Sequence, residues 1–245
     1  LMPPNKLYYK SNFSVLFFFG LIIILPFIGI FSKVSYDLNL FFDFFQNSYT
    51  HRLIYFSFYQ AFVSAILSCF LAIPFALALN RHKDLKIIKF IISLCGFCFV
   101  IPTILIVYAV IKLYGNNGFY NSYFNLYEYL SIETIFGIKA ILIAHTLLNT
   151  PFATRLFIQS LNSIPSKYYE ISGSLNIKFL GNLIRLELPY IKQNFFSVFS
   201  IIFSLCFLSF AIVMALGGGP MHSTIEVAIY QYALFELNFN KAILL

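Results

Sequence analysis

Five long apolar runs constrain the fold of this chain more than any other feature of its sequence. They cover residues 13–31, 53–79, 87–111, 138–160 and 195–216. An α-helix needs about 20 apolar residues to cross a hydrocarbon core of roughly 30 Å. Hydrophobic residues make up 60% of the 245 and charged residues only 10%, a composition that excludes a water-soluble globular protein. The sequence therefore predicts an all-α, polytopic bundle of transmembrane helices.

The two ends of the chain decide how many membrane spans we expect. The first run follows Lys6 and Lys10 and has no small-residue cleavage pattern behind it, so we interpret it as a span and not as a removed signal peptide. Residues 240–245 begin another apolar run that is too short to cross a membrane. We therefore expect five complete spans and the start of a sixth. Together they form a single transmembrane domain over residues 1–245, truncated at its C-terminus.

Between and within the runs, several segments carry turn or helix-breaking residues. We expect a mixed polar loop over residues 33–53, and a loop with a short surface helix over residues 112–138. Pro102 stands in the middle of the third run, where it predicts a kink. Three glycines and a proline at residues 217–220 predict a sharp helix end, followed by a short surface helix over residues 224–231.

Basic residues decide the predicted orientation. Cytoplasmic flanks of membrane spans carry an excess of Lys and Arg. With the N-terminus inside, most of the sixteen Lys and Arg residues fall in cytoplasmic segments. We therefore expect the N-terminus and the polar loop over residues 163–190 on the cytoplasmic side.

That polar loop is larger than a simple turn requires. A helix over residues 166–175, entered through Pro165, would carry an apolar face. Asn176 tolerates a left-handed backbone and predicts a bend before a second short helix over residues 179–186. Leu188 and Pro189 are expected to end this unit. Two interpretations stay open, a solvated connector or a pair of docking helices that carries force between a soluble partner and the spans.

The spacing of this loop resembles the coupling motif of ABC importer permeases, E-A-A-x3-G-x9-I-x-L-P. Aligned on Glu170, the chain has Ile171 and Ser172 for the alanines and Asn176 for the glycine. Leu186 stands for the isoleucine, and the final Leu-Pro is unchanged. The resemblance implies that this loop couples the permease to an ATPase. The implied coupling residues are Tyr168, Tyr169, Glu170, Ile171, Ser172, Leu175, Asn176, Leu188 and Pro189.

Two further stretches, residues 141–165 and 205–231, are similar to the first half of the thiamine and thiamine pyrophosphate permease family. The second stretch has Gly-Gly-Gly-Pro followed by Thr-Ile-Glu-x-Ala-Ile-Tyr-Gln. The resemblance implies a type I ABC importer permease fold in the inner membrane of a bacterial cell. It also implies two cytoplasmic ATPase subunits, a periplasmic thiamine-binding protein and a second permease half, fused or separate. The permease would move thiamine or its phosphates by alternating access and would not itself be an enzyme.

Polar residues in the fourth run are candidates for the translocation path. His145 and Asn149 stand four residues apart, on one helical face that Phe152 extends. Such residues mark pathways, but they also join helices by hydrogen bonds, and both interpretations stay open. A second set could form an outer gate or could serve only as solvated surface. That set is Gly217, Gly218, Gly219, Pro220, Glu226, Tyr230 and Gln231.

Other kinds of site are disfavoured. Cys95 and Cys98 have the spacing of a redox or zinc pair, but no second pair accompanies them. The glycine run lacks the Gly-Lys-Ser/Thr ending of a phosphate-binding loop, and the basic residues are too scattered for nucleic acid. We expect no catalytic residue, metal or cofactor. Two alternatives stay open, a ferric-iron ABC permease of the same superfamily and a truncated membrane remnant that does not transport.

Overall fold

The computed structural model of the chain describes residues 6–32, 38–98, 100–115, 117–124 and 136–245. The chain divides into two compact units, one over residues 51–227 and the other over residues 1–50 and 228–245. Every regular element within the described residues is helical, which confirms the predicted fold class.

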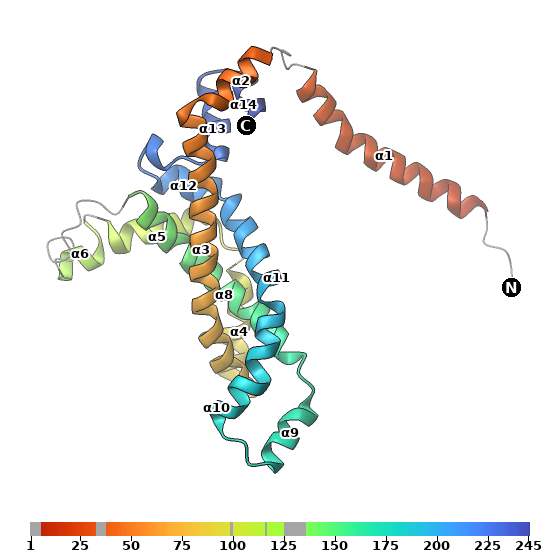
Figure 1. Cartoon of the computed structure of the whole chain (residues 1–245), viewed down its shortest axis with the longest axis vertical. Coiled ribbons are helices and arrows are strands. Elements are labelled where there is room, and N and C mark those ends of the chain that lie inside the picture. The colour runs from red at the N-terminus through yellow and green to blue at the C-terminus, as the bar shows by residue number, and fades with distance from the viewer. Residues whose placement is uncertain (1–5, 33–37, 99, 116, 125–135) are drawn as a thin grey trace. The chain divides into compact units, whose positions relative to one another are not determined.

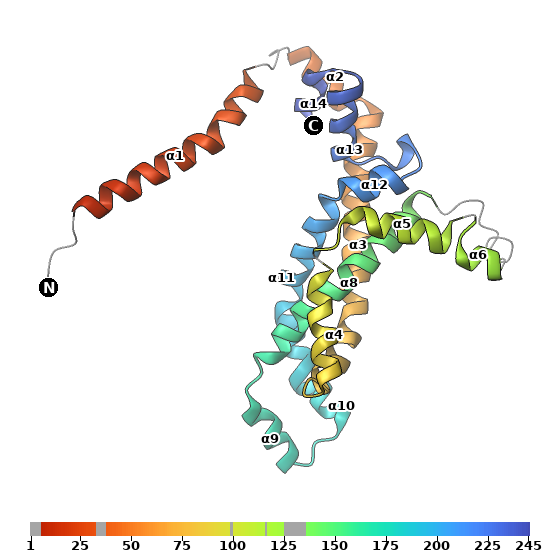
Figure 2. The same ribbon diagram turned by 180° about the vertical axis from the view of Figure 1, so that it is seen from behind.

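Three helices of the described residues are long and apolar enough to cross a membrane. They are α3 (Ser48–Arg81), α8 (Ile138–Asn162) and a continuous helix over Phe179–Phe207 that ends in α11 (Leu188–Phe207). The three lie side by side in the larger unit when it is seen from either side (Figures 1 and 2). The second and fourth predicted spans are confirmed, and the fifth begins earlier in the chain than predicted.

Small side chains on one face of α3 allow this close packing. They recur every three or four residues and are fully buried, at Ala61, Ala65, Cys69, Ala72 and Ala76. The same cluster includes Phe157 of α8 and Ile202 of α11. Because lipid is as apolar as the helices themselves, association in a bilayer depends on such close approach rather than on a hydrophobic driving force.

The third predicted span is not one helix. The run divides into α4 (Lys86–Phe97) and α5 (Thr103–Tyr114), with Pro102 in an extended conformation before α5. A proline lacks the backbone N–H and its ring clashes with the preceding turn, so a helix cannot pass through it undisturbed. The predicted kink is therefore a complete break.

The fifth run is also interrupted. α11 ends at Phe207, and α12 (Phe210–Leu216) begins only after Leu208 and Ser209 leave helical geometry. Neither residue is Gly or Pro, so nothing in the local sequence marks this break. The predicted helix end after Leu216 is confirmed, since Gly218 and Gly219 have φ angles of 70° and 135°, which favour glycine.

Outside these spans, residues 33–53 are more helical than predicted, while two other segments contain the helices expected there. α1 (Lys6–Phe31) contains the first apolar run. The expected loop over residues 33–53 instead holds α2 (Leu38–Gln46) and the start of α3, and residues 33–37 lie outside the described part. α6 (Phe119–Phe124) supplies the short helix expected within residues 112–138, of which residues 125–135 are not described.

The C-terminal segments are short helices. α13 (Ile225–Tyr230) continues into a π-helical turn over Gln231–Phe235, as the mixed polarity of residues 224–231 predicts. α14 (Phe239–Leu244) follows. Within the smaller unit, the ring of Phe44 on α2 lies 6.3 Å from that of Tyr232.

The packing of α3 generates a first prediction. Replacing the fully buried Ala65 with Leu should lower the free energy of unfolding by about 1–3 kcal/mol, because the added methylenes force the helices apart. Ala78 lies on the same helix and is exposed, so Ala78→Leu is the matched control and should have little effect. Unfolding of the detergent-purified protein would measure both, and equal stability of the two variants would contradict close packing of this face.

Candidate functional site

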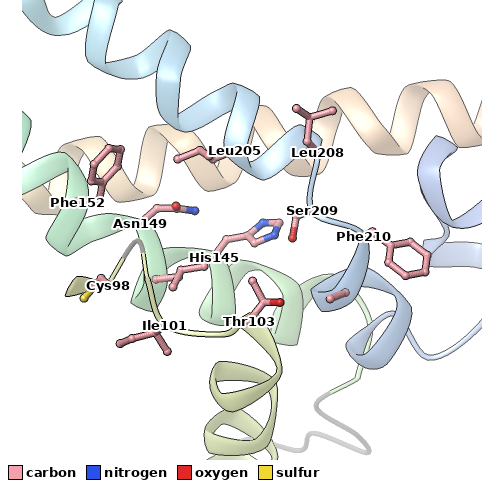
Figure 3. A pocket seen from close by; sticks show the side chains of 12 residues that line it. Cys98, Ile101, Thr103, His145, Asn149, Phe152, Leu205, Leu208, Ser209 and Phe210 are labelled. Carbon is pink, nitrogen blue, oxygen red and sulfur yellow. The ribbon is translucent and has the colours of Figure 1, made fainter. Parts of the chain in front are cut away.

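A cavity of about 360 Å³ lies where the two helix breaks meet the polar face of α8 (Figure 3). Its wall is built from three elements that are distant in sequence. The break between α4 and α5 supplies Cys98 and Ile101, and the start of α5 supplies Thr103. α8 supplies His145, Leu148, Asn149 and Phe152. The break between α11 and α12, with the adjoining helix ends, supplies Leu205, Leu208, Ser209, Phe210 and Ala211.

His145 is the most deeply buried polar residue of this wall, with 1% of its surface exposed. Its Nδ1 atom lies 3.0 Å from the hydroxyl oxygen of Ser64 on α3. Its Nε2 atom is buried and has no hydrogen-bond partner among the described residues. Because a ring nitrogen can donate or accept depending on the tautomer, the buried Nε2 atom of His145 is left as an unused polar atom of a residue that lines the cavity.

Asn149 is also buried, and its side-chain amide donates a hydrogen bond of 3.2 Å to the sulfur of Cys206 on α11. Gln60 on α3 donates to the backbone carbonyl of the same Cys206, at 3.1 Å. His145 and Asn149 thus make the interhelical hydrogen bonds that one of the two interpretations expects. Their role in a path stays a prediction.

The wall is largely apolar, with a few convergent polar groups. Thr103 and Ser209 provide hydroxyl groups, and Phe152 and Phe210 provide aromatic rings. Such a lining is typical of sites that bind small organic molecules. Among the described residues, no group of three or more His, Cys, Asp or Glu side chains could hold a metal ion.

The polar loop that follows α8 has the predicted shape. α9 (Ser166–Ser174) starts after Pro165, and Asn176 has a φ of 51° before α10 (Phe179–Asn182). The amide of Ile177 donates to the carbonyl of Ser172 at 3.0 Å and closes the bend. The predicted helix, left-handed bend and second helix are therefore confirmed as structure.

Leu188 and Pro189 do not end this unit, contrary to the prediction. α10 continues through a π-helical turn over Leu183–Glu187 directly into α11. The amide of Leu188 bonds to the carbonyl of Leu183, five residues back. In a regular α-helix the ring of Pro189 would clash with the carbonyl group four residues before it, and the wider π-helical turn relieves that clash.

The coupling residues predicted on α9 divide into two sets. Tyr168, Ile171 and Leu175 are 49%, 46% and 67% exposed, and Glu170 is exposed as well. Ser172 instead faces inward and donates a hydrogen bond to the side-chain oxygen of Asn182. One face of α9 is therefore open to a partner, while the other joins α9 to α10.

Sequence reasoning missed a partly buried ion pair beside this loop. The guanidinium group of Arg81, at the end of α3, contacts both carboxylate oxygens of Glu187, with N···O distances of 2.5 and 3.3 Å. The ring of Phe179 lies 4.0 Å from the same guanidinium. No local signal could have revealed a pair separated by 106 residues.

Tyr169 lies beside this pair. Its hydroxyl group is buried without a hydrogen-bond partner among the described residues. Burial and, next, the carboxylate of Glu187 raise the pKa of this hydroxyl, while Arg81 acts in the opposite direction. The side chain is therefore a neutral polar group enclosed next to two opposite charges.

The predicted outer-gate residues are not among the residues that line this cavity. Gly217, Gly218, Gly219 and Pro220 connect α12 to α13, and the amide of Gly137 donates to the carbonyl of Leu216 at 2.8 Å. α13 starts where the amide of Ile225 donates to the hydroxyl of Ser57 at 2.9 Å. Glu226, Tyr230 and Gln231 follow on α13 and its π-helical extension, and none of these gate residues lines the cavity around His145.

Comparison with known proteins gives the chain clear relatives, although no family model matches it. It is 39% identical over 200 residues to the thiamine transport system permease protein ThiP of Haemophilus influenzae, covering 82% of this chain and 37% of that protein. It is 35% identical over 203 residues to ThiP of Escherichia coli, with the same two coverages of 82% and 37%. The chain thus spans about 37% of the length of the curated relatives that it matches.

A solved structure shows the same fold. A chain of a bacterial ABC transporter involved in the import of the acidic polysaccharide alginate superposes with a TM-score of 0.77 at 16% identity. The superposition covers 97% of this chain and 87% of that chain. The chain is therefore a homologue of one part of the ThiP thiamine transport permeases, and it has the multi-span permease fold of a bacterial ABC importer.

Proposed function

We propose that the chain is part of a permease through which an ATP-driven importer moves thiamine or thiamine phosphates across a bacterial inner membrane. The observation that carries this proposal is the cavity, where two broken helices meet the polar face of α8. Broken helices at membrane depth are tolerated where they line a cavity, and in transporters they form substrate sites. The similarity to ThiP over most of the chain supports thiamine as the substrate.

The cavity suits a small heteroaromatic molecule. Its volume of about 360 Å³ lies in the range of pockets for small organic ligands, about 300–1,000 Å³. In the proposal, Phe152 and Phe210 contact the flat faces of the substrate. The unused ring nitrogen of His145 and the amide of Asn149 contact its polar edge.

Transport in this proposal is alternating access without covalent chemistry. Two cytoplasmic ATPases dock on the exposed face of α9 and hydrolyse ATP, and a periplasmic protein delivers the substrate to the outer side. A second permease half completes the path. The N-terminus and the polar loop are cytoplasmic, and the segment from Gly217 to Gln231 serves as the outer gate.

Uptake of labelled thiamine by cells or membrane vesicles that contain the protein tests this proposal. We expect uptake to require ATP and to fall when unlabelled thiamine competes. Deletion of the gene should abolish the saturable part of uptake. Uptake that responds to ferric iron and not to thiamine would overturn the proposed substrate and favour an iron permease.

Replacing His145 with Leu separates a path residue from one that only joins helices. We expect thiamine uptake per molecule of permease to fall about tenfold, the effect of losing one hydrogen bond to the substrate, about 1–1.5 kcal/mol. His82→Leu, in an exposed turn, is the matched control. If His145→Leu lowers only the amount of assembled protein, with uptake per molecule unchanged, His145 does not contact the substrate.

Replacing Glu170 with Lys tests the coupling role of α9. Reversing an exposed charge at a docking surface places like charges together, which costs several kcal/mol. We therefore expect at least about tenfold less ATPase to co-purify with the permease, together with a loss of uptake. Glu236→Lys makes the same change at another exposed position and should leave both unaltered. Normal co-purification and normal uptake of the Glu170→Lys variant would rule out this docking site.

A further inference from the structure

The Arg81–Glu187 ion pair joins two parts of the larger unit that the chain itself does not connect closely. Arg81 is the last residue of α3, and Glu187 lies in the π-helical turn that leads from the polar loop into α11. The contact is bidentate, the geometry in which a guanidinium group holds a carboxylate in a defined orientation. It therefore ties the end of α3 to the helix that follows α9.

The carboxylate of this pair is buried and the guanidinium group is partly exposed. The side chain of Glu187 is only 4% exposed and that of Arg81 is 26% exposed. The ring of Phe179 covers the guanidinium group, and the enclosed hydroxyl of Tyr169 lies nearby. A buried carboxylate that loses its only cation is strongly unfavourable, whereas an exposed pair contributes little. Movement that separated the two charges would thus be resisted.

Contacts lead from this pair in two directions. Toward the polar loop, Asn182 on α10 accepts a hydrogen bond from Ser172 on α9, so α9 is held to the helix that carries Glu187. Toward the cavity, Arg81 ends the helix whose Ser64 contacts His145. At 1.5 Å per residue, Ser64 and Arg81 are about 25 Å apart along α3. One continuous helix, α3, therefore connects the ion pair to the residue that contacts His145.

We propose that Arg81 and Glu187 are positioning residues that transmit displacement of the coupling loop to α3 and hence to the cavity. This inference rests on the proposed function, because it assumes that an ATPase pulls on α9. When α9 moves, α10 and the π-helical turn move with it, and the ion pair makes the end of α3 follow. Without the pair, ATP hydrolysis would displace the loop without repositioning Ser64 and His145.

Transport and ATP hydrolysis measured together test this role. The complete permease, assembled with its ATPase and binding protein in proteoliposomes, would be compared with Glu187→Gln, Arg81→Gln and the double variant. We expect each single variant to transport about fivefold fewer thiamine molecules per ATP, the lower end of typical coupling between sites, with the KM for thiamine unchanged. The double variant should be no worse than either single one, because both remove the same contact.

Two further variants separate positioning from simple stability. Arg81→Lys keeps the charge but not the bidentate fork, and we expect it to restore part of the coupling. Lys83→Gln removes an exposed hydrogen bond of 2.8 Å to Asn162 near the same helix end, and it should leave thiamine transported per ATP unchanged. Additive losses in the double variant, or a lower protein yield with normal transport per ATP, would overturn the inference.

A measurement without substrate distinguishes failure of this inference from failure of the proposed function. Backbone amide hydrogen exchange over residues 166–182 can be followed in the purified permease alone. We expect Glu187→Gln to accelerate exchange there at least about threefold, and Lys83→Gln to leave it unchanged. If exchange in Glu187→Gln is unchanged, the ion pair does not hold the coupling loop to the end of α3, and the inference is overturned. If Glu187→Gln accelerates exchange but the wild-type complex does not transport thiamine, only the proposed function is overturned.

Discussion

Inside a bilayer every backbone N–H and C=O group must find its partner within the protein, because lipid offers none. This constraint explains why every regular element of the described residues is helical. It also means that each break in a helix needs a structural explanation. The two breaks, at Pro102 and at Leu208–Ser209, both face the cavity beside α8. The non-helical backbone at both breaks therefore adjoins this cavity.

The polar side chains of the cavity wall must also find hydrogen-bond partners within the protein. Polar side chains inside a membrane protein are costly unless they are hydrogen-bonded. His145 uses one ring nitrogen to contact Ser64, and Asn149 uses its amide to contact Cys206. Helix packing and substrate contact are therefore not exclusive functions, because a single imidazole ring has two nitrogen atoms. The first is used for packing, and the second has no hydrogen-bond partner among the described residues.

The polar loop is only partly packed against the rest of the protein. One face of α9 is exposed, whereas α10 continues directly into the membrane span. Pro189 makes the helix widen into a π-helical turn, and that turn carries Glu187 toward Arg81. A residue that would usually end a helix thereby contributes to a continuous one. α10, the π-helical turn and α11 form one continuous helix behind α9, which suits a segment proposed to carry force.

Much of the secondary structure of this protein could be predicted from local sequence. Apolar runs of membrane length, Asn176 at a left-handed bend and glycines after Leu216 are local signals, because each depends on the residue itself and its immediate neighbours. The four-residue spacing of His145 and Asn149 likewise placed both on one face. Only the tertiary structure decided the break at Leu208–Ser209, the contacts with Ser64 and Cys206, and the Arg81–Glu187 pair. These depend on residues far apart in the chain that helix packing brings together, and no pattern along one helix specifies its neighbour.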